Sequence, residues 1–305
     1  MRIKRIIRYT LLGLGAILLL AGLLAGTTWL YYHPGVQRMN GFVYGHRLGH
    51  DLKFDVIQPA NTNGIGVIIM VSGRWKSGEA GSFRHWITAP LLRHGYTVIP
   101  VYHLSQPEAT IAEITEDVNR AVRFIRHHAR EYGVDPMRLG LTGGSAGGHL
   151  SLMIATRGGP GAPDAADPVD RESSAVQAVA IFYPVTDLLN LGSSTENLGD
   201  GGPPKSFVAG FGPLATNMAT WKVLGRDLSP IYFVSSNQPP ILIYHGDADT
   251  LVPLEQSQRF QTEARKAGAT VELVVHHKGQ HGWLTMVWDI RRFADWYDRY
   301  LRKME

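Results

Sequence analysis

The chain has 305 residues, of which 44% are hydrophobic and 18% charged, which is typical of one large globular domain and excludes a disordered or multi-span membrane protein. It contains no cysteine, which excludes disulfides, zinc–thiolate sites and a cysteine nucleophile. The net charge is +4, but six of the 30 Lys and Arg residues precede the first acidic residue, Asp51, which leaves 24 against 26 acidic residues. The basic excess therefore belongs to the N-terminal segment, and a nucleic-acid-binding surface is not expected.

The N-terminal segment has the features of a membrane anchor. Residues 10–32 carry no charge and are long enough, as a helix, to cross a hydrocarbon core of about 30 Å. Trp29, Tyr31 and Tyr32 at the end of this run favour the interface, and the four cations before it favour a cytoplasmic N-terminus. We therefore predict a cytoplasmic tail and single-pass anchor at 1–33, a linker at 34–50 and a catalytic domain at 51–305 outside the cytoplasm. A cleaved signal peptide and a secreted protein are the alternative.

Short apolar strands then alternate with helical patterns, which predicts a mostly parallel sheet covered by helices on both faces. The strands are expected at 52–58, 65–71, 97–102, 138–142, 176–183, 241–244 and 270–276. Helices are expected from Ala109 to near Gly133, from Ser145, over 254–267 and over 284–302. The segment 188–240 is rich in Gly, Pro, Ser and Asn, and we predict that it is a cap or lid insertion that shapes the substrate pocket. A short helical excursion on the surface is the alternative.

A serine with small neighbours lies between a predicted strand and a predicted helix. Residues 143–147 read Gly-Gly-Ser-Ala-Gly and match G-x-S-x-G, the pattern of a nucleophile elbow. An elbow strains the backbone at the serine, so the flanking positions must be nearly free of side chains, as they are here. No Lys follows the glycines, which argues against a phosphate-binding loop. The pattern predicts Ser145 as a nucleophile.

A serine nucleophile requires a general base and a carboxylate that orients the base. In a fold with this elbow the expected chain order is serine, acid, histidine. Asp249, in the loop after the strand at 241–244, is the preferred acid, with Asp247 and Asp187 as competitors. His281 follows the acid in a loop between the last strand and the last helix and has glycines on either side at 279 and 282, so we predict it as the base. His276 and His277, which end that strand, are expected to be structural.

Backbone N–H groups are expected to stabilise the oxyanion. The helix that begins at the serine directs its N-terminal N–H groups and positive dipole end there, and the N–H of Ala146 is one candidate donor. The loop after the strand at 65–71 reads Ser-Gly-Arg-Trp where esterases often have H-G-G-G, and it offers Gly73 or Arg74 as the second donor.

The chain resembles the esterase and lipase branch of the α/β-hydrolases, especially hormone-sensitive-lipase-like and BD-FAE-like carboxylesterases. The likeness spans residues 52–301 and includes the segments 102–104, 131–136, 143–150, 183–187, 229–230 and 245–253. The resemblance implies an α/β-hydrolase fold, a triad of Ser145, Asp249 and His281, and hydrolysis of carboxylic esters. It also makes Asp187 structural. The departures at residues 73–74 and at His103 bear on substrate preference.

The predicted function is therefore a serine esterase that works through an acyl-enzyme, with no metal or cofactor. The expected partners are a small-molecule, carbohydrate or lipid ester and the membrane that holds the anchor. A prolyl-oligopeptidase-like peptidase is one alternative, although nothing in the chain has the length or repeats of a propeller domain. A catalytically silent binding protein with the same fold is the other.

Overall fold

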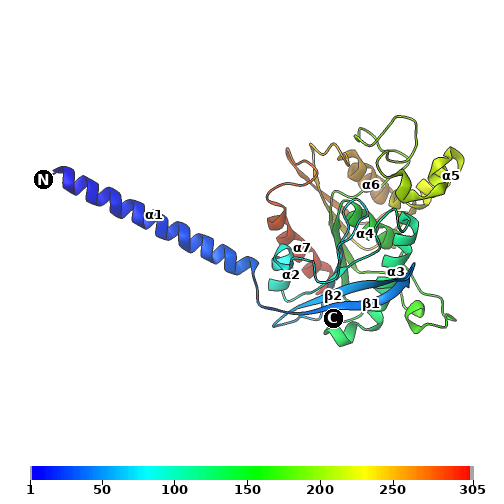
Figure 1. Cartoon of the computed structure of the whole chain (residues 1–305), viewed down its shortest axis with the longest axis horizontal. Coiled ribbons are helices and arrows are strands. Elements are labelled where there is room, and N and C mark those ends of the chain that lie inside the picture. The colour runs from blue at the N-terminus through cyan, green and yellow to red at the C-terminus, as the bar shows by residue number, and fades with distance from the viewer. Residues whose placement is uncertain (1, 303–305) are drawn as a thin grey trace.

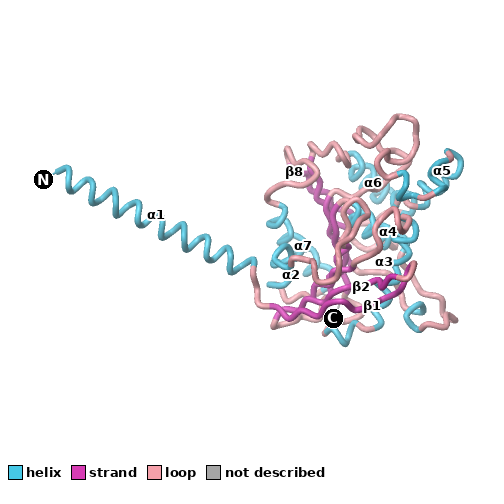
Figure 2. Tube along the Cα trace, viewed as in Figure 1, coloured by secondary structure: helices cyan, strands magenta, loops and turns pink. Residues whose placement is uncertain are grey.

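The computed structural model describes residues 2–302 and places one mixed eight-stranded sheet at the centre of the catalytic body (Figures 1 and 2). The strands are β1 (Val36–Arg47), β2 (His50–Pro59), β3 (Gly66–Met70), β4 (Thr97–Val101), β5 (Leu139–Gly144), β6 (Ala178–Phe182), β7 (Ile241–Gly246) and β8 (Val271–His276). They lie in the order β1-β2-β4-β3-β5-β6-β7-β8. β1 and β2 pair antiparallel and β2 is antiparallel to β4, whereas all neighbours from β4 to β8 are parallel. The prediction of a mostly parallel sheet is confirmed.

Helices cover both faces of the sheet. The helices are α1 (Arg2–Tyr32), α2 (Ala89–Arg93), α3 (Ile111–His127), α4 (Ala146–Arg157), α5 (Met218–Asp227), α6 (Glu255–Lys266) and α7 (Met286–Leu301). α3, α4 and α6 contribute to one apolar core and α2 and α7 to a second core on the other face. The helices on the two faces thus fix the sheet in place. The predicted site residues lie at the C-terminal ends of its parallel strands.

β3 illustrates why the sequence forms buried strands. All five of its residues are buried, with Val67 and Ile69 in the core under α2 and α7 and Ile68 and Met70 in the core under α3 and α4. Because successive side chains point to opposite faces and both faces are covered, the strand is apolar throughout. Full burial of one such side chain contributes about 1.5–3 kcal/mol.

The segment predicted as a linker, 34–50, is instead mostly strand. β1 pairs with β2 along the edge of the sheet, and its register shifts between Met39 and Phe42 and again between Val43 and Gly45. These irregularities interrupt the alternation of inward and outward side chains that identifies a half-buried strand. The linker prediction is corrected for this reason, and only residues 33–35 separate α1 from the sheet.

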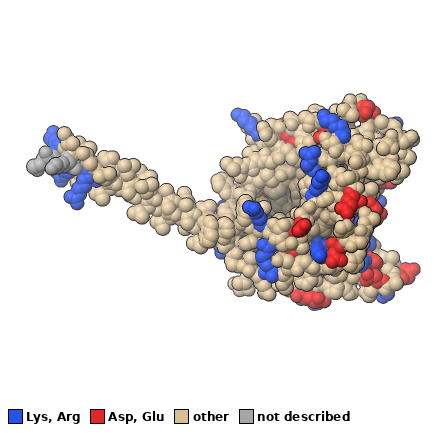
Figure 3. Space-filling view, in the orientation of Figure 1, with Lys and Arg blue, Asp and Glu red and all other residues tan. Residues whose placement is uncertain are grey.

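α1 projects from the body as a single exposed helix (Figure 1). Its part from Arg5 to Tyr32 is long and apolar enough to cross a membrane, with a mean hydropathy of 2.1, although a signal sequence has the same features. Arg side chains lie at the free end of α1 and are absent from its middle (Figure 3).

The predicted cap segment, 188–240, consists of loops, short 3-10 turns and α5. Its helix α5 lies near α6, on the side of the body away from α1 (Figure 1).

Candidate active site

Ser145 lies in the sharp turn between β5 and α4. Its backbone has φ 55° and ψ −120°, which is a strained conformation for a residue with a side chain. Its N–H donates to the carbonyl of Phe182 at 3.1 Å, so the adjacent strand β6 holds the turn in place. The turn presents the hydroxyl at the C-terminal edge of the sheet, at the start of a helix.

Two glycines of the motif are required by close backbone approach. A Cβ on Gly143 would lie 2.5 Å from the backbone of Gly147, and a Cβ on Gly147 would lie 2.4 Å from the carbonyl oxygen of Met70. Both distances are far inside van der Waals contact with backbone that cannot move aside. The spacing of glycines around the serine is therefore a steric condition for the turn.

The three side chains selected from the sequence lie together at this edge. Nε2 of His281 is 2.9 Å from Oγ of Ser145, and Nδ1 of His281 is 2.7 Å from Oδ2 of Asp249. Each distance is that of a good hydrogen bond. The side chain of His281 is 24% exposed, whereas the side chain of Asp249 is fully buried. The arrangement can move a proton from the hydroxyl to an imidazole that a carboxylate orients.

The surroundings of Asp249 keep it ionised. Burial alone would raise its pKa, but the nearby imidazole of His245 and the hydrogen bond with His281 hold the pKa well below its usual value. Its Oδ1 also accepts the N–H groups of Leu251 and Val252, both at 3.0 Å. The loop after β7 is thus folded around this carboxylate.

His245 is a supporting residue that the sequence did not reveal. It is fully buried, its Nε2 lies 2.7 Å from the carbonyl of Val252, and its Nδ1 lies 2.7 Å from Oγ of Ser257 on α6. A carbonyl can only accept, so Nε2 carries a proton and donates it to Val252. His245 therefore ties the acid loop to α6.

Asp247, the nearest competitor for the acid, has other partners. Its carboxylate lies 2.8 Å from Nδ1 of His277 and accepts the N–H of Lys278 at 2.6 Å. The side chain of His277 is 81% exposed, and His276 packs against the ring of Trp283. Asp247 thus closes the loop that follows β8 and has no hydrogen bond to His281 among the described residues.

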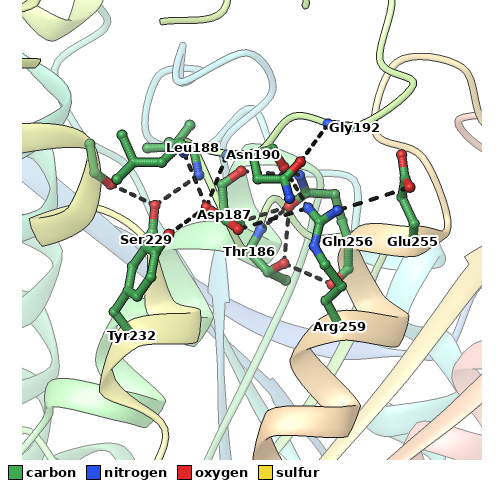
Figure 4. Close-up of polar contacts among 12 residues, drawn as sticks. Thr186, Asp187, Leu188, Asn190, Gly192, Ser229, Tyr232, Glu255, Gln256 and Arg259 are labelled. Atoms are coloured by element: carbon green, nitrogen blue, oxygen red, sulfur yellow. Dashed lines mark hydrogen bonds and ion pairs between the residues drawn. The ribbon is translucent and has the colours of Figure 1, made fainter. Parts of the chain in front are cut away.

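Asp187, the third candidate, anchors the start of the cap segment (Figure 4). Its Oδ1 accepts the N–H groups of Leu189 and Asn190, both at 3.1 Å, and lies 3.3 Å from the hydroxyl of Tyr232. Burial raises the pKa of this carboxyl. The side-chain amide of Gln256 on α6 donates to the carbonyls of Asp187 and Asn190. The role is structural: this network fixes the cap to α6.

The loop after β3 faces the serine with two residues in left-handed backbone. Arg74 has φ 58° and Trp75 has φ 53°. The N–H of Gly73 already donates to the carbonyl of Lys76 at 3.0 Å, so this group is a poor candidate for the oxyanion hole. Within residues 2–302 the N–H groups of Arg74 and Ala146 have no protein acceptor, which leaves both free for a ligand. Of the two loop residues expected from the sequence, the geometry therefore favours Arg74.

A buried histidine holds this loop in place. The indole N–H of Trp75 donates to Nδ1 of His149 at 3.1 Å, and Nε2 of His149 lies 2.7 Å from the carbonyl of Leu228. An indole can only donate and a carbonyl can only accept, so the imidazole is neutral with its proton on Nε2. His149 thus joins α4, the loop of Arg74 and the end of α5, elements more than 70 positions apart in the chain.

His149 should make stability depend on pH. Burial, opposed by the hydrogen bond to Leu228, lowers its pKa to about 4 from an unfolded value near 6.5. The unfolded state therefore binds the extra proton first, and the free energy of unfolding falls as pH drops from about 6.5 to about 4, by about 3 kcal/mol in all. We expect His149→Gln to reduce the pH dependence of urea unfolding in the full chain in detergent.

The same replacement at His46, whose side chain is 72% exposed, controls for the loss of one histidine. Parallel stability curves for wild type and His149→Gln between about pH 7 and about pH 5 would contradict this assignment.

A small apolar cavity opens beside the serine. It has a volume of ≈ 40 Å³ and is lined by Ser145 and Ala146, by residues of the loop after β3, by Leu251, Val252 and Pro253, and by cap residues. The cap contributes Leu191, Ser194, Glu196, Pro204 and Phe207. One water needs at least about 10–15 Å³ on this measure, so the cavity has room for a group of only a few heavy atoms. Within residues 2–302 no three His, Asp or Glu side chains form a group that could hold a metal ion.

Comparisons with known proteins agree with the fold and with an esterase family. Residues 54–264 match the family model BD-FAE. The chain is 30% identical over 194 residues to a probable carboxylic ester hydrolase, LipM, of Mycobacterium tuberculosis, an alignment that covers 64% of this chain and 43% of LipM. The chain therefore spans less than half the length of this relative.

Two solved structures share the fold. A truncated carbohydrate esterase from gut microbiota aligns with a TM-score of 0.70 and 25% identity over 88% of this chain and 97% of that chain. The butyrate-bound esterase Est2 of Thermogutta terrifontis aligns with a TM-score of 0.64 and 25% identity over 87% of this chain and 94% of that chain. The predicted α/β-hydrolase fold and the resemblance to esterases are confirmed.

Proposed function

The chain belongs to the BD-FAE family of α/β-hydrolase-fold esterases, and from this premise we propose that it is a serine carboxylic ester hydrolase. The observation that carries the proposal is the pair of hydrogen bonds made by His281, at 2.9 Å to Ser145 and at 2.7 Å to Asp249. A neutral imidazole between a hydroxyl and a buried carboxylate has the geometry for general-base activation of a nucleophile.

In the proposed reaction His281 removes the proton of Ser145 as the oxygen attacks the ester carbonyl. The N–H groups of Ala146 and Arg74 bind the oxyanion, and each such donor is worth roughly 2.7–4 kcal/mol of transition-state stabilisation. The protonated His281 then gives its proton to the departing alcohol, leaving an acyl group on the serine. A water molecule, activated by the same imidazole, releases the acid and restores the hydroxyl.

The cavity supports a preference for short acyl groups. Its volume of ≈ 40 Å³ and its apolar walls suit an acyl chain of a few carbons, and the relative with bound butyrate carries an acid of that size. A longer chain would have to displace Trp75 or Phe207, which pack edge to face with ring centroids 5.3 Å apart. We therefore propose that the preferred substrates are small-molecule esters with short acyl groups.

The test is ester hydrolysis by the full chain in detergent, with p-nitrophenyl acetate, butyrate and octanoate, beside covalent labelling by a fluorophosphonate. We expect turnover of acetate and butyrate and a label on the peptide that contains Ser145. A folded protein that is neither labelled nor active would overturn the proposal. Labelling together with cleavage of peptides, and no ester turnover, would favour the peptidase alternative.

Phe207→Ala should lengthen the preferred acyl chain. Phe207 lines the cavity and lies under the guanidinium of Arg74, 5.2 Å from the ring centroid, so its removal opens the wall. Because each methylene in an apolar pocket is worth at least about tenfold, kcat/KM for octanoate relative to acetate should rise by about tenfold or more. Phe211→Ala is the matched control, since Phe211 is equally buried and packs on Trp75 but does not line the cavity. The same shift in both variants would contradict this role for Phe207.

We also propose that α1 is retained as a single-pass anchor with the catalytic body outside the cytoplasm. Its length, its hydropathy and the cations at its free end support this topology. Trp29 and Tyr31 lie near its other end, where aromatic side chains favour the interface.

A further inference from the structure

We propose that the catalytic body rests on the bilayer through a second contact, an apolar patch formed by Trp86, Leu284, Val287 and Trp288. We name these four residues the bilayer-facing patch. The inference depends on the proposed anchoring by α1 and is independent of the proposed triad chemistry. The occupant is the surface of the same lipid bilayer that α1 enters.

The first observation is exposure. Leu284 is 97% exposed and Trp288, four residues later, is 57% exposed. Leu284 is thus more exposed than any large apolar side chain of α1, the most exposed of which is Ile3 at 74%. α7 needs neither residue for its core contacts, because Ile290 and Phe293 are buried against the sheet. Large apolar side chains gathered on one face of a soluble body indicate a surface that something covers.

The second observation is that two residues of the patch, Trp86 and Val287, lie beside α1. One apolar groove is lined by Leu24, Thr28 and Trp29 on the helix and by Trp86 and Val287 on the body. Leu24 lies eight residues before the end of α1, which places it about 12 Å along the helix axis into the apolar run. The groove therefore lies where the last turns of α1 meet the body. Interfacial apolar groups sink about 5–10 Å into a bilayer, so side chains of the body beside the last turns of α1 lie at the depth where such contacts form when α1 spans the bilayer.

The third observation is the set of cations and aromatic rings around the end of α1. Arg93 donates through Nε to the carbonyl of Tyr31 at 3.2 Å, and the guanidinium of Arg291 lies 4.7 Å from the centroid of the Tyr31 ring. Arg side chains at this level can reach lipid phosphates, and tyrosine and tryptophan prefer the headgroup region. Figure 1 shows α1 leaving the body beside α2 and α7, the helices that carry these arginines.

The acidic residues nearby do not oppose this contact. Asp289 accepts the indole N–H of Trp283 at 2.6 Å, and Asp295 lies 3.7 Å from the guanidinium of Arg292. The anchor also holds the patch against the lipid without a further loss of translational freedom, since the second contact is intramolecular in effect. Burial of a few methylene groups is then enough to keep the body in contact with the bilayer.

The absence of cysteine permits a direct test. Leu284→Cys and, separately, Val223→Cys are made in the full chain, labelled with an environment-sensitive fluorophore and reconstituted in vesicles of phosphatidylethanolamine and phosphatidylglycerol. Val223 is the matched control, because it is 63% exposed on α5, on the side of the body away from α1 (Figure 1). Lipids with a nitroxide on the acyl chain quench only labels that reach the bilayer.

We expect the label at position 284 to be quenched several-fold more strongly than the label at 223. Equal quenching at the two positions would overturn the proposal, and so would a chain that does not float with the vesicles. Ester hydrolysis is measured separately on the unlabelled wild-type chain in the same vesicles, because position 284 is three residues from His281. Strong quenching at position 284 without esterase activity of the wild-type chain would refute the proposed function alone, and activity with equal quenching would refute the bilayer contact alone.

Discussion

Asp249→Asn is expected to lower kcat by roughly 10⁴-fold while the protein stays folded. In the proposed triad the buried carboxylate accepts a hydrogen bond from the Nδ1–H of His281 at 2.7 Å. This bond fixes the tautomer that leaves Nε2 free to take the proton of Ser145. An amide can present an N–H instead, which favours the wrong tautomer, and it carries no charge to stabilise the imidazolium. Stopped-flow or steady-state hydrolysis of p-nitrophenyl acetate gives the measurement.

Asp187→Asn is the matched control for this variant. Asp187 is also a buried acid in a loop at the same edge of the sheet, and it too accepts two backbone N–H groups. Its oxygens bond to the cap, so we expect a loss of stability and a change in kcat far below that of Asp249→Asn. Equal losses of kcat in the two variants would contradict the assignment of Asp249 as the triad acid.

Ser145→Ala should lower kcat by roughly 10⁶-fold and abolish covalent labelling by a fluorophosphonate. The alanine keeps the Cβ and the strained turn but removes the oxygen that lies 2.9 Å from His281. Whatever rate remains must come from the oxyanion hole and from water. Intrinsic fluorescence and urea unfolding show whether the variant is folded.

Ser151→Ala provides the control on the same helix. Ser151 is buried on α4 and donates its hydroxyl to the carbonyl of Gly147 at 2.8 Å, so its loss perturbs the same helix without touching the reacting atoms. We expect near-normal kcat and full labelling. A Ser145→Ala protein that remains folded and hydrolyses esters at the rate of this control would exclude Ser145 as the nucleophile.

The sheet could be predicted from the sequence because most of its strands are covered on both faces. β3, β4 and β6 are buried at every position, and such strands appear in the sequence as short apolar runs with turn residues between them. β1 could not be predicted in the same way. Its residues are mostly half-buried and its register shifts twice, so no simple alternation marks it.

Some site residues could likewise be predicted from the sequence and others could not. Ser145 lies in a local motif, and the motif is visible because backbone contacts at Gly143 and Gly147 exclude side chains. Asp249 and His281 were selected by their order and their loops. The support given by His149 to Trp75 has no local pattern, since it depends on contacts among residues 74 and 79 positions apart.

The engagement of Gly73 with Lys76 was equally invisible in the sequence. The loop after β3 departs from the H-G-G-G pattern, and only its folded geometry shows which N–H groups are already donated within the chain. The sequence could place the second donor in the loop after the strand at 65–71, but it could not distinguish between two adjacent backbone N–H groups.

Under the proposed anchoring, the short connection between α1 and β1 limits where this protein can work. Three residues, 33–35, extend at most about 11 Å. With α1 in the bilayer, the length of this connection and the size of the catalytic body set the largest distance between the active site and the lipid surface. An ester that stays far from the membrane surface is then out of reach, however well its acyl group fits the cavity. Distance from the membrane thereby becomes a criterion of substrate selection in addition to shape and chemistry.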